Sequence, residues 1–212
     1  SIGSNIVRRV LVADDGSIWA GTREAGLNRF HRNSGTFSQY RLMSSEGTDS
    51  IFALMQDSSG AIWAGGDHGL SRINYKTGDV TTYTNIENDE TSLSGHSVRA
   101  AFEDSHGQLW VGTYGGGLHR FDAQTGTFTR FEHDASDTTS ISGNEVTSIY
   151  EDSSDRLWVG TTEGLNLVNR ESGKFVRYVG SKDDATTLAD NSITEIFEDR
   201  GGILWVGTKT KG

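Results

Sequence analysis

The stretch SVRAAFEDSHGQLWVGTYGGGLHRFDAQTGTFTRF, residues 97–131, contains the pattern that decides the fold, because most of the chain consists of approximate copies of it. Each copy has one tryptophan, with Ile or Leu directly before it and glycine two residues after it. The tryptophans are Trp19, Trp63, Trp110, Trp158 and Trp205, spaced 44, 47, 48 and 47 residues apart. The matching glycines are Gly21, Gly65, Gly112, Gly160 and Gly207. A period of about 40 to 50 residues built from short apolar runs and turns is typical of a β-propeller blade.

Turn residues divide each unit into four short strands. In the first unit, the predicted strands are residues 5–13, 17–22, 26–32 and 36–42. The expected blades are residues 5–49, 50–95, 96–142 and 143–190, with a half blade at 191–212. One such sheet cannot bury both faces, whereas sheets stacked around an axis can. The sequence therefore predicts an all-β fold: a single partial β-propeller over residues 1–212, with about four and a half blades of four antiparallel strands and a core built on the repeated Trp and Gly.

Composition narrows the possible functions. The net charge of -10 argues against a nucleic-acid or anionic-membrane surface, because both partners are negative themselves. The chain has no Cys, no apolar run near the roughly 18 residues of a membrane span, and no signal-peptide pattern. Because it begins at Ser1 and its fifth unit is half a unit, we expect a fragment of a longer propeller, which forms an open arc or self-associates through exposed blade faces.

Three motifs that resemble ligand sites have simpler structural readings. Aspartates precede glycine-type turns, as calcium ligands do, but an Asp that bonds its own hairpin amides explains the pattern. These aspartates are Asp57, Asp104, Asp152 and Asp199. The segment GTYGGGLHR, residues 112–120, lacks the helix that a phosphate-binding glycine loop requires. The six histidines fall at different repeat phases without an H-x-x-x-H pair, so no metal or cofactor is predicted.

The repeat resembles the two-component regulator propeller family. The resemblance rests on EDSHGQLWVGTYGGGLHRFDAQTGTFTRF, EDSSDRLWVGTTEGLNLVNRESGKFVRY and the linkers SLSGHSV, SISGNEV and TLADNSI. That family forms the extracytoplasmic sensor of bacterial receptors, among them histidine kinases, hybrid two-component regulators and diguanylate cyclases. The resemblance implies a periplasmic, non-catalytic ligand sensor whose partners are an oligosaccharide or other small ligand and the remaining blades of its ring. Contact with a membrane would come only from parts of the receptor outside this chain.

The loops between second and third strands are the expected ligand-binding elements. They read REAG, GDHG, TYGGG and TTEG, and they share a face with the variable connections between units, whereas the opposite face carries uniform turns. Variable loops on a rigid scaffold commonly carry function. The predicted ligand-binding residues are Arg23, Glu24, Asp67, His68, Tyr114 and Glu163. No catalytic residue is predicted.

Two other functions are consistent with this sequence. One is a stand-alone binding or scaffolding propeller, which a membrane span and a kinase or cyclase domain in the same gene would exclude. The other is a propeller glycosidase or lyase, because propeller glycosidases use carboxylates near the axis and Glu24, Asp67 and Glu163 lie in loops. A carboxylate pair at glycosidase spacing would favour the enzyme.

Overall fold

The computed structural model describes residues 1–40, 42, 49–95, 97–181, 184 and 186–210, and within these ranges the chain forms 18 strands and no helix. The strands form four antiparallel sheets of four strands and one of two. The prediction of an all-β partial propeller with four-stranded blades and a two-stranded fifth is confirmed. None of the described residues forms a helix that is long and apolar enough to cross a membrane.

Each sheet keeps its strands in chain order. The first sheet consists of β1 (Val7–Val12), β2 (Ile18–Thr22), β3 (Leu27–His31) and β4 (Thr36–Tyr40). The second consists of β5 (Ile51–Gln56), β6 (Ile62–Gly66), β7 (Gly69–Asn74) and β8 (Asp79–Tyr83). The third consists of β9 (Ser97–Glu103), β10 (Leu109–Tyr114), β11 (Leu118–Asp122) and β12 (Thr127–Phe131). The fourth consists of β13 (Val146–Glu151), β14 (Leu157–Thr161), β15 (Gly164–Asn169) and β16 (Lys174–Tyr178), and β17 (Ile193–Glu198) pairs with β18 (Leu204–Thr208).

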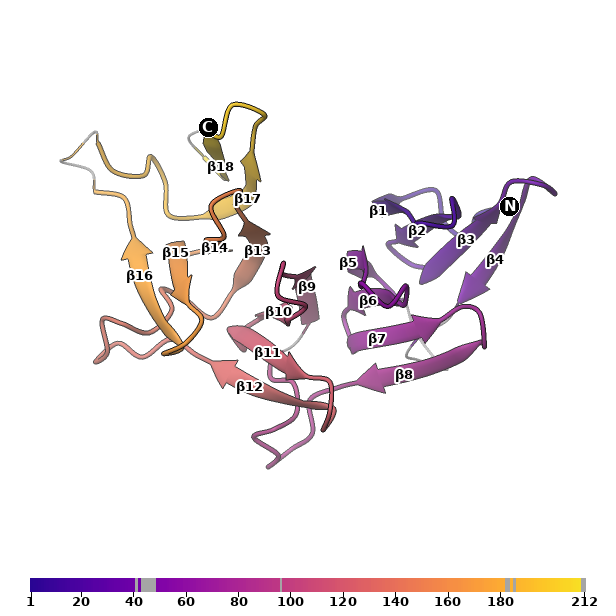
Figure 1. Cartoon of the computed structure of the whole chain (residues 1–212), viewed down its shortest axis with the longest axis horizontal. Coiled ribbons are helices and arrows are strands. Elements are labelled where there is room, and N and C mark those ends of the chain that lie inside the picture. The colour runs from indigo at the N-terminus through magenta and orange to yellow at the C-terminus, as the bar shows by residue number, and fades with distance from the viewer. Residues whose placement is uncertain (41, 43–48, 96, 182–183, 185, 211–212) are drawn as a thin grey trace.

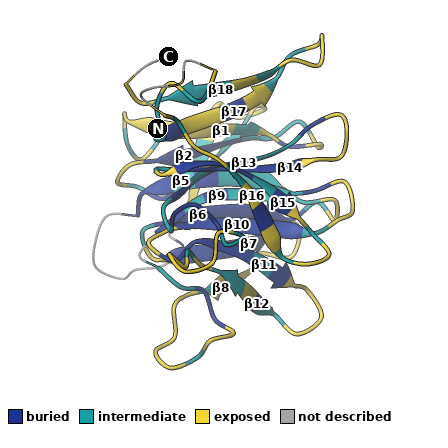
Figure 2. Ribbon diagram, turned by 90° about the vertical axis from the view of Figure 1, so that its left-hand side faces the viewer, coloured by how far each residue is buried: buried dark blue, intermediate teal, exposed yellow. Residues whose placement is uncertain are grey.

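The sheets stand side by side in an arc, with the first strand of each on the inner side and the fourth strand on the outer side (Figure 1). Contacts between sheets are made mainly by the inner strands, which pack β1 on β5, β5 on β9, β9 on β13 and β13 on β17. Burial is deepest in the middle sheets, and the first and last sheets of the stack carry more exposed residues (Figure 2). The core therefore lies between neighbouring blades.

The repeated aspartate holds both its own turn and the repeat tryptophan. In the third sheet, one carboxylate oxygen of Asp104 accepts the backbone N–H groups of His106 and Gln108 at 3.1 and 2.9 Å. The other oxygen accepts the indole N–H of Trp110 at 2.8 Å. The same two sets of bonds recur at Asp57, Asp152 and Asp199. The turn interpretation of these aspartates is confirmed.

Each of the first four tryptophans packs against the sheet that follows its own. Trp19 and Trp63 contact Tyr75 and Phe121 of the next sheet, with ring centroids 5.7 and 5.4 Å apart. The glycine two residues later makes room for the first strand of that sheet, because a methyl group at Gly112 would overlap the Val146 side chain. Gly21, Gly65 and Gly160 face a β-branched side chain of the next sheet in the same way.

The fifth tryptophan shows what this packing contributes. Trp205 keeps its bond to Asp199, yet 59% of its surface is exposed, because no further sheet covers β18 in this structure. Trp110, in contrast, is 1% exposed. Both residues have the same local hairpin, but Trp110 is also covered by the outer strands of its own sheet and by the fourth sheet, whereas β18 has neither in the described chain.

Candidate functional site

A β-bulge near the start of each first strand turns one side chain out of the regular ladder. In the second sheet, Ile51 pairs with Gly66 and Ala53 with Gly65, which leaves Phe52 between them without a partner. The same shift leaves Arg8, Arg99, Thr147 and Thr194 unpaired in the other sheets. Bulges re-aim side chains and are common beside functional sites. Here they place one variable side chain per blade on the innermost strand.

Four of these bulge residues line a single cavity of about 630 Å³. We call it the axial cavity, because its walls come from the inner strands of four consecutive sheets. Its lining residues are Ile6, Val7, Arg8, Arg9, Phe52, Arg99, Tyr114, Val146, Thr147 and Thr162. Tyr114 is the last residue of β10 and Thr162 directly follows β14, so the cavity lies next to the variable loops at the ends of these strands. Its volume is in the range of small-molecule sites.

Two arginines stack on one aromatic ring in this cavity. The guanidinium carbon of Arg99 lies 3.7 Å from the Phe52 ring centroid, and that of Arg8 lies 4.7 Å from it. Arg99 also approaches the Tyr114 ring at 5.5 Å and donates its Nε–H to the Ser97 hydroxyl at 2.9 Å. Within the described part of the chain, neither arginine forms an ion pair. The guanidinium groups therefore keep N–H donors for a ligand.

The electrostatics of the cavity favour an anion. Burial lowers the pKa of Arg99, and the charge of Arg8 acts in the same direction, whereas Asp67 and Glu145 oppose it. No carboxylate is among the described residues that line the cavity. An anionic group bound here would offset the repulsion between the two arginines, which Asp67 and Glu145 counter only from outside the cavity lining.

Two polar side chains complete the lining. The Thr147 hydroxyl is buried and has no hydrogen-bond partner within the described chain, which is a cost unless a ligand or water supplies one. Tyr114 is exposed, and a hydrogen bond to the Glu145 carboxylate raises the pKa of its phenol. Glu145 thereby fixes the orientation of a ring that stands at the edge of the cavity.

The structure brings together only some of the predicted ligand-binding residues. Tyr114 lies on the axial cavity, while Asp67 and His68 line an adjoining hollow of about 400 Å³ between the second and third sheets. Arg23 and Glu24 form an exposed ion pair, with Arg23 Nε 3.8 Å from a Glu24 carboxylate oxygen. Glu163 is also exposed, and its side chain lies over Gly143. Arg23, Glu24 and Glu163 do not line the axial cavity.

Sequence reasoning did not identify Arg8, Phe52, Arg99 and Thr147. A signal was present, because these residues stand eleven positions before each tryptophan, directly after the β-branched residue at twelve. The position changes from Arg to Phe to Arg to Thr, as expected for a site that is specific to each blade. These residues can be recognised as a site only when the bulge is known. The alternation of apolar and polar residues in a short strand does not reveal a bulge.

A different cluster has the composition of a metal site. Ligand atoms of His106, Glu151 and Asp155 lie within 4.8 Å of one another. The guanidinium of Arg170 already contacts both carboxylates and also reaches Asp104, with Nε 3.0 Å from a carboxylate oxygen. The cluster is therefore an arginine–carboxylate network, and it carries no argument for a metal.

Comparison with known proteins agrees with the repeat. Residues 92–115, 140–163 and 187–210 match the model of the family described as two component regulator propeller. Each matched segment covers a first strand, the tryptophan hairpin and the loop that follows. Three segments of the chain thus match the repeat of this family, and the resemblance inferred from the sequence is confirmed. No curated protein matches the chain.

Solved structures with the same fold include an extracellular domain of a putative hybrid two component system, a bacterial surface component and an enzyme. The extracellular domain of a putative hybrid two component system from B. thetaiotaomicron is 22% identical, with a TM-score of 0.71 over 100% of this chain and 33% of that one. PorZ, a surface component of the type-IX secretion system of Porphyromonas gingivalis, is 16% identical, with a TM-score of 0.72 over 98% of this chain and 31% of that one. Virginiamycin B lyase from Staphylococcus aureus is 16% identical, with a TM-score of 0.71 over 97% and 65%. The chain spans about a third of the two component system domain, and at these identities the likeness concerns the fold.

Proposed function

We propose that this chain is a non-catalytic, ligand-binding part of the extracytoplasmic sensor propeller of a bacterial signalling receptor. The observation that carries the proposal is the axial cavity, in which Arg8 and Arg99 stack on Phe52 without an ion-pair partner among the described residues. The family match and the fold shared with an extracellular sensor domain support the receptor context. A glycosidase would need paired carboxylates at the site, and none of the described lining residues is acidic.

The chemistry of the cavity suggests a ligand with an anionic group and a flat or apolar surface. Arginine presents planar N–H donors that match a carboxylate bidentately. Phe52 and Tyr114 add ring faces, and the Thr147 hydroxyl adds an unsatisfied polar group. A small oligosaccharide with a carboxylate fits this description. Within this proposal, the anion binds between the two guanidinium groups and a sugar ring packs on Tyr114.

The remaining predicted residues belong to this proposal as contacts for a longer ligand. Asp67 and His68 line the adjoining hollow on the same face, so a ligand that extends outward from the axis would meet them next. Arg23, Glu24 and Glu163 lie on other loops of that face and would contact only a ligand that spreads across several blades. Their substitution is expected to change affinity less than substitution of Arg99.

A binding screen tests the site. Carboxylated oligosaccharides and neutral oligosaccharides of equal length would be compared by thermal shift, and the best compound titrated against Arg8→Ala and Arg99→Ala. Each variant should weaken binding by about tenfold or more, because a charge-assisted hydrogen bond contributes roughly 1.5–3 kcal/mol. Arg200→Ala, an exposed arginine in the turn between β17 and β18, is the matched control. Equal binding of neutral and carboxylated compounds would contradict the proposed anion site.

A separate experiment tests the receptor context. An antibody raised against the chain would detect the native protein in fractionated cells. A band far above 23.1 kDa in the membrane fraction supports the receptor. A soluble band near 23.1 kDa would favour a stand-alone binding propeller instead.

A further inference from the structure

One side chain closes the space between neighbouring sheets on the face opposite the variable loops. At two interfaces, it belongs to the residue directly after the third strand. Tyr75 follows β7, and its ring contacts Trp19 while its hydroxyl bonds the Asp15 carboxylate of the preceding sheet. Arg170 follows β15, and it reaches back to Asp104 of the preceding sheet. We call this residue the plug of its interface.

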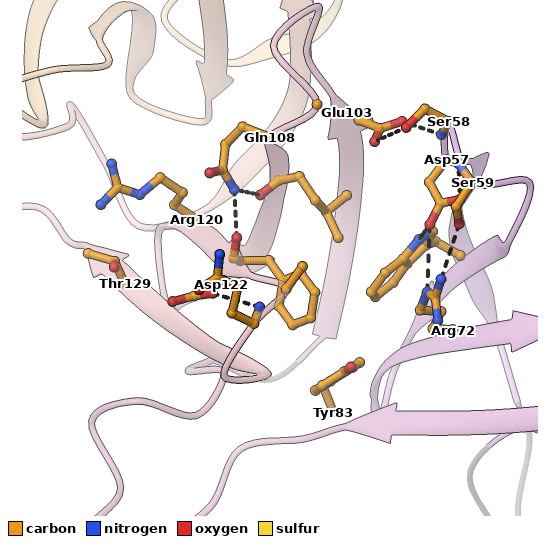
Figure 3. A pocket seen from close by; sticks show the side chains of 16 residues that line it. Asp57, Ser58, Ser59, Arg72, Tyr83, Glu103, Gln108, Arg120, Asp122 and Thr129 are labelled. Carbon is orange, nitrogen blue, oxygen red and sulfur yellow. Dashed lines mark hydrogen bonds and ion pairs between the residues drawn. The ribbon is translucent and has the colours of Figure 1, made fainter.

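The interface between the second and third sheets has no such plug, because the residue after β11 is Ala123. A cavity of about 620 Å³, the plug cleft, lies at this place (Figure 3). Phe121 fills part of the space between the sheets through contacts with Trp63 and Tyr83, with ring centroids 5.4 and 5.1 Å apart. The polar part of the interface, where Arg170 lies one blade further on, remains open.

Most of the acceptors that hold the arginine plug are retained in the plug cleft; the exception is the Asp155 carboxylate, 3.3 Å from Arg170 Nη1, because Gly107 stands at that position. Around Arg170, they are the carboxylates of Asp104 and Glu151 and the carbonyl oxygen of Asp155, which accepts from Nη1 at 2.7 Å. The residues at the same repeat positions one blade earlier are Asp57, Glu103 and Gly107, and all three line the plug cleft.

Glu103 is the carboxylate that lacks its cation. It accepts the backbone N–H and the hydroxyl of Ser58, as Glu151 does with Ser105 (Figure 3). Glu151 also pairs with Arg170, whereas Glu103 forms no ion pair within the described part of the chain. At the interface closed by the neutral Tyr75, the same position holds the neutral Gln56. A carboxylate thus accompanies the arginine plug and persists where the arginine is missing.

The two arginines near the plug cleft are engaged elsewhere. Arg72 donates to the Ser59 hydroxyl at 3.1 Å, and its Nε lies 3.6 Å from an Asp57 carboxylate oxygen (Figure 3). Arg120 lies over the Phe131 ring of its own sheet, 5.9 Å from the centroid. Neither guanidinium reaches Glu103, so the acceptors of Glu103 and Gly107 remain available to an incoming donor.

We propose that the plug cleft binds a guanidinium group supplied from outside the chain, as an arginine or as an arginine side chain of a peptide. The guanidinium occupies the place that Arg170 holds at the next interface and donates to Glu103 and to the carbonyl of Gly107. The methylene stem then lies along the apolar surface that Ala123 leaves open. This site is separate from the axial cavity and lies on the opposite face.

The test uses the indole N–H of Trp63 as its NMR reporter, because Trp63 lines the plug cleft and each of the five tryptophans contributes one indole N–H, assigned by single substitution. Argininamide is titrated into the whole chain, with the neutral isostere citrullinamide as the ligand control. A saturable shift at Trp63, absent at Trp110 and absent with citrullinamide, is expected. Equal effects of both compounds, or no saturable shift at Trp63, would overturn the proposal.

Three variants separate the proposed site from a general effect on folding. Glu103→Gln should weaken argininamide binding by about tenfold. Glu198→Gln, which alters the equivalent bonds to Ser153 outside the cleft, should leave binding unchanged. Ala123→Arg should abolish binding, because it supplies the missing plug within the chain. Unchanged affinity in Glu103→Gln or in Ala123→Arg would refute the proposal.

A peptide titration identifies the source of the guanidinium. An acetylated Gly-Arg-Gly amide is compared with argininamide on the same reporter. Tighter binding of the peptide supports a protein partner, and equal or weaker binding supports a small ligand; both results retain the guanidinium site. The axial-cavity variant Arg99→Ala should not change either titration, so failure of this site and failure of the axial site are distinguishable.

Discussion

His119 should make the stability of this fold depend on pH, and the repeat itself provides the control. Its imidazole is fully buried on β11; Nε2 accepts the Ser94 backbone N–H at 3.1 Å and Nδ1 donates to the Val111 carbonyl at 3.3 Å. One blade later, Asn166 makes the same two bonds, to the Ser142 N–H at 2.9 Å and the Val159 carbonyl at 3.1 Å. His119→Asn therefore replaces the titratable group by a residue that this position already accepts.

The magnitude follows from the pKa. Burial lowers the pKa of His119 from 6.5 to about 4, and the charge of Arg130 acts in the same direction. Because the folded-state pKa lies below the unfolded one, the unfolded state takes up the proton first as the pH falls. The contribution to stability is fully present above about pH 6.5 and is lost progressively towards pH 4. At about 1.36 kcal/mol per pKa unit, the loss is about 2 kcal/mol at pH 5.

Urea unfolding followed by tryptophan fluorescence at pH 7 and pH 5 measures this difference. All other titrating groups are shared by the two proteins, so their effects cancel when the pH-induced changes are compared. The wild-type chain should lose about 2 kcal/mol more free energy of unfolding than His119→Asn between the two pH values. Equal losses would refute the assignment of a buried neutral imidazole at this position.

Two further pairs of substitutions test how the blades pack. Trp110→Ala should cost about 3–5 kcal/mol of unfolding free energy, whereas Trp205→Ala, at a tryptophan that is 59% exposed, should cost less than about 1 kcal/mol in urea unfolding. Similar costs would contradict the view that the surrounding strands and the following sheet stabilise the fold by burying Trp110. Gly112→Ala should lower the melting temperature because its methyl group would overlap Val146, while Gly207→Ala meets only the end of a threonine side chain and should have little effect in calorimetry. A melting temperature unaffected by Gly112→Ala would contradict the close approach of the sheets.

The sequence predicts the fold well because the repeat depends on local signals. The spacing of the tryptophans, the turn residues and the glycines that follow each tryptophan are properties of single blades, and the structure confirms the strands that they indicate. One blade differs from the others at its turn: Asp155 stands where they have a glycine. It adopts a left-handed φ of 62°, as those glycines do, so the turn is retained.

The sites are harder to predict because they arise between blades. The variable loops directed attention to Tyr114, which lines the axial cavity, but Arg8, Phe52 and Arg99 lie within strands and meet only because three bulges bring them to one cavity. The plug cleft at Ala123 could not be predicted from the sequence either, because the space that Ala123 leaves depends on side chains of the neighbouring sheet. A repeat therefore reveals its shared positions more readily than the positions at which its blades differ.

The most direct test of the central claim is hydrogen exchange of the chain with and without the compound that gives the largest thermal shift. If ligands bind in the axial cavity, exchange should slow in residues 6–9, 51–53, 98–100 and 145–148, which come from four separate blades. The same compound should leave the exchange of Arg99→Ala unchanged at matched concentration. Slowed exchange confined to the outer strands β4, β8, β12 and β16, or no slowing in the inner strands, would contradict a ligand site at the propeller axis.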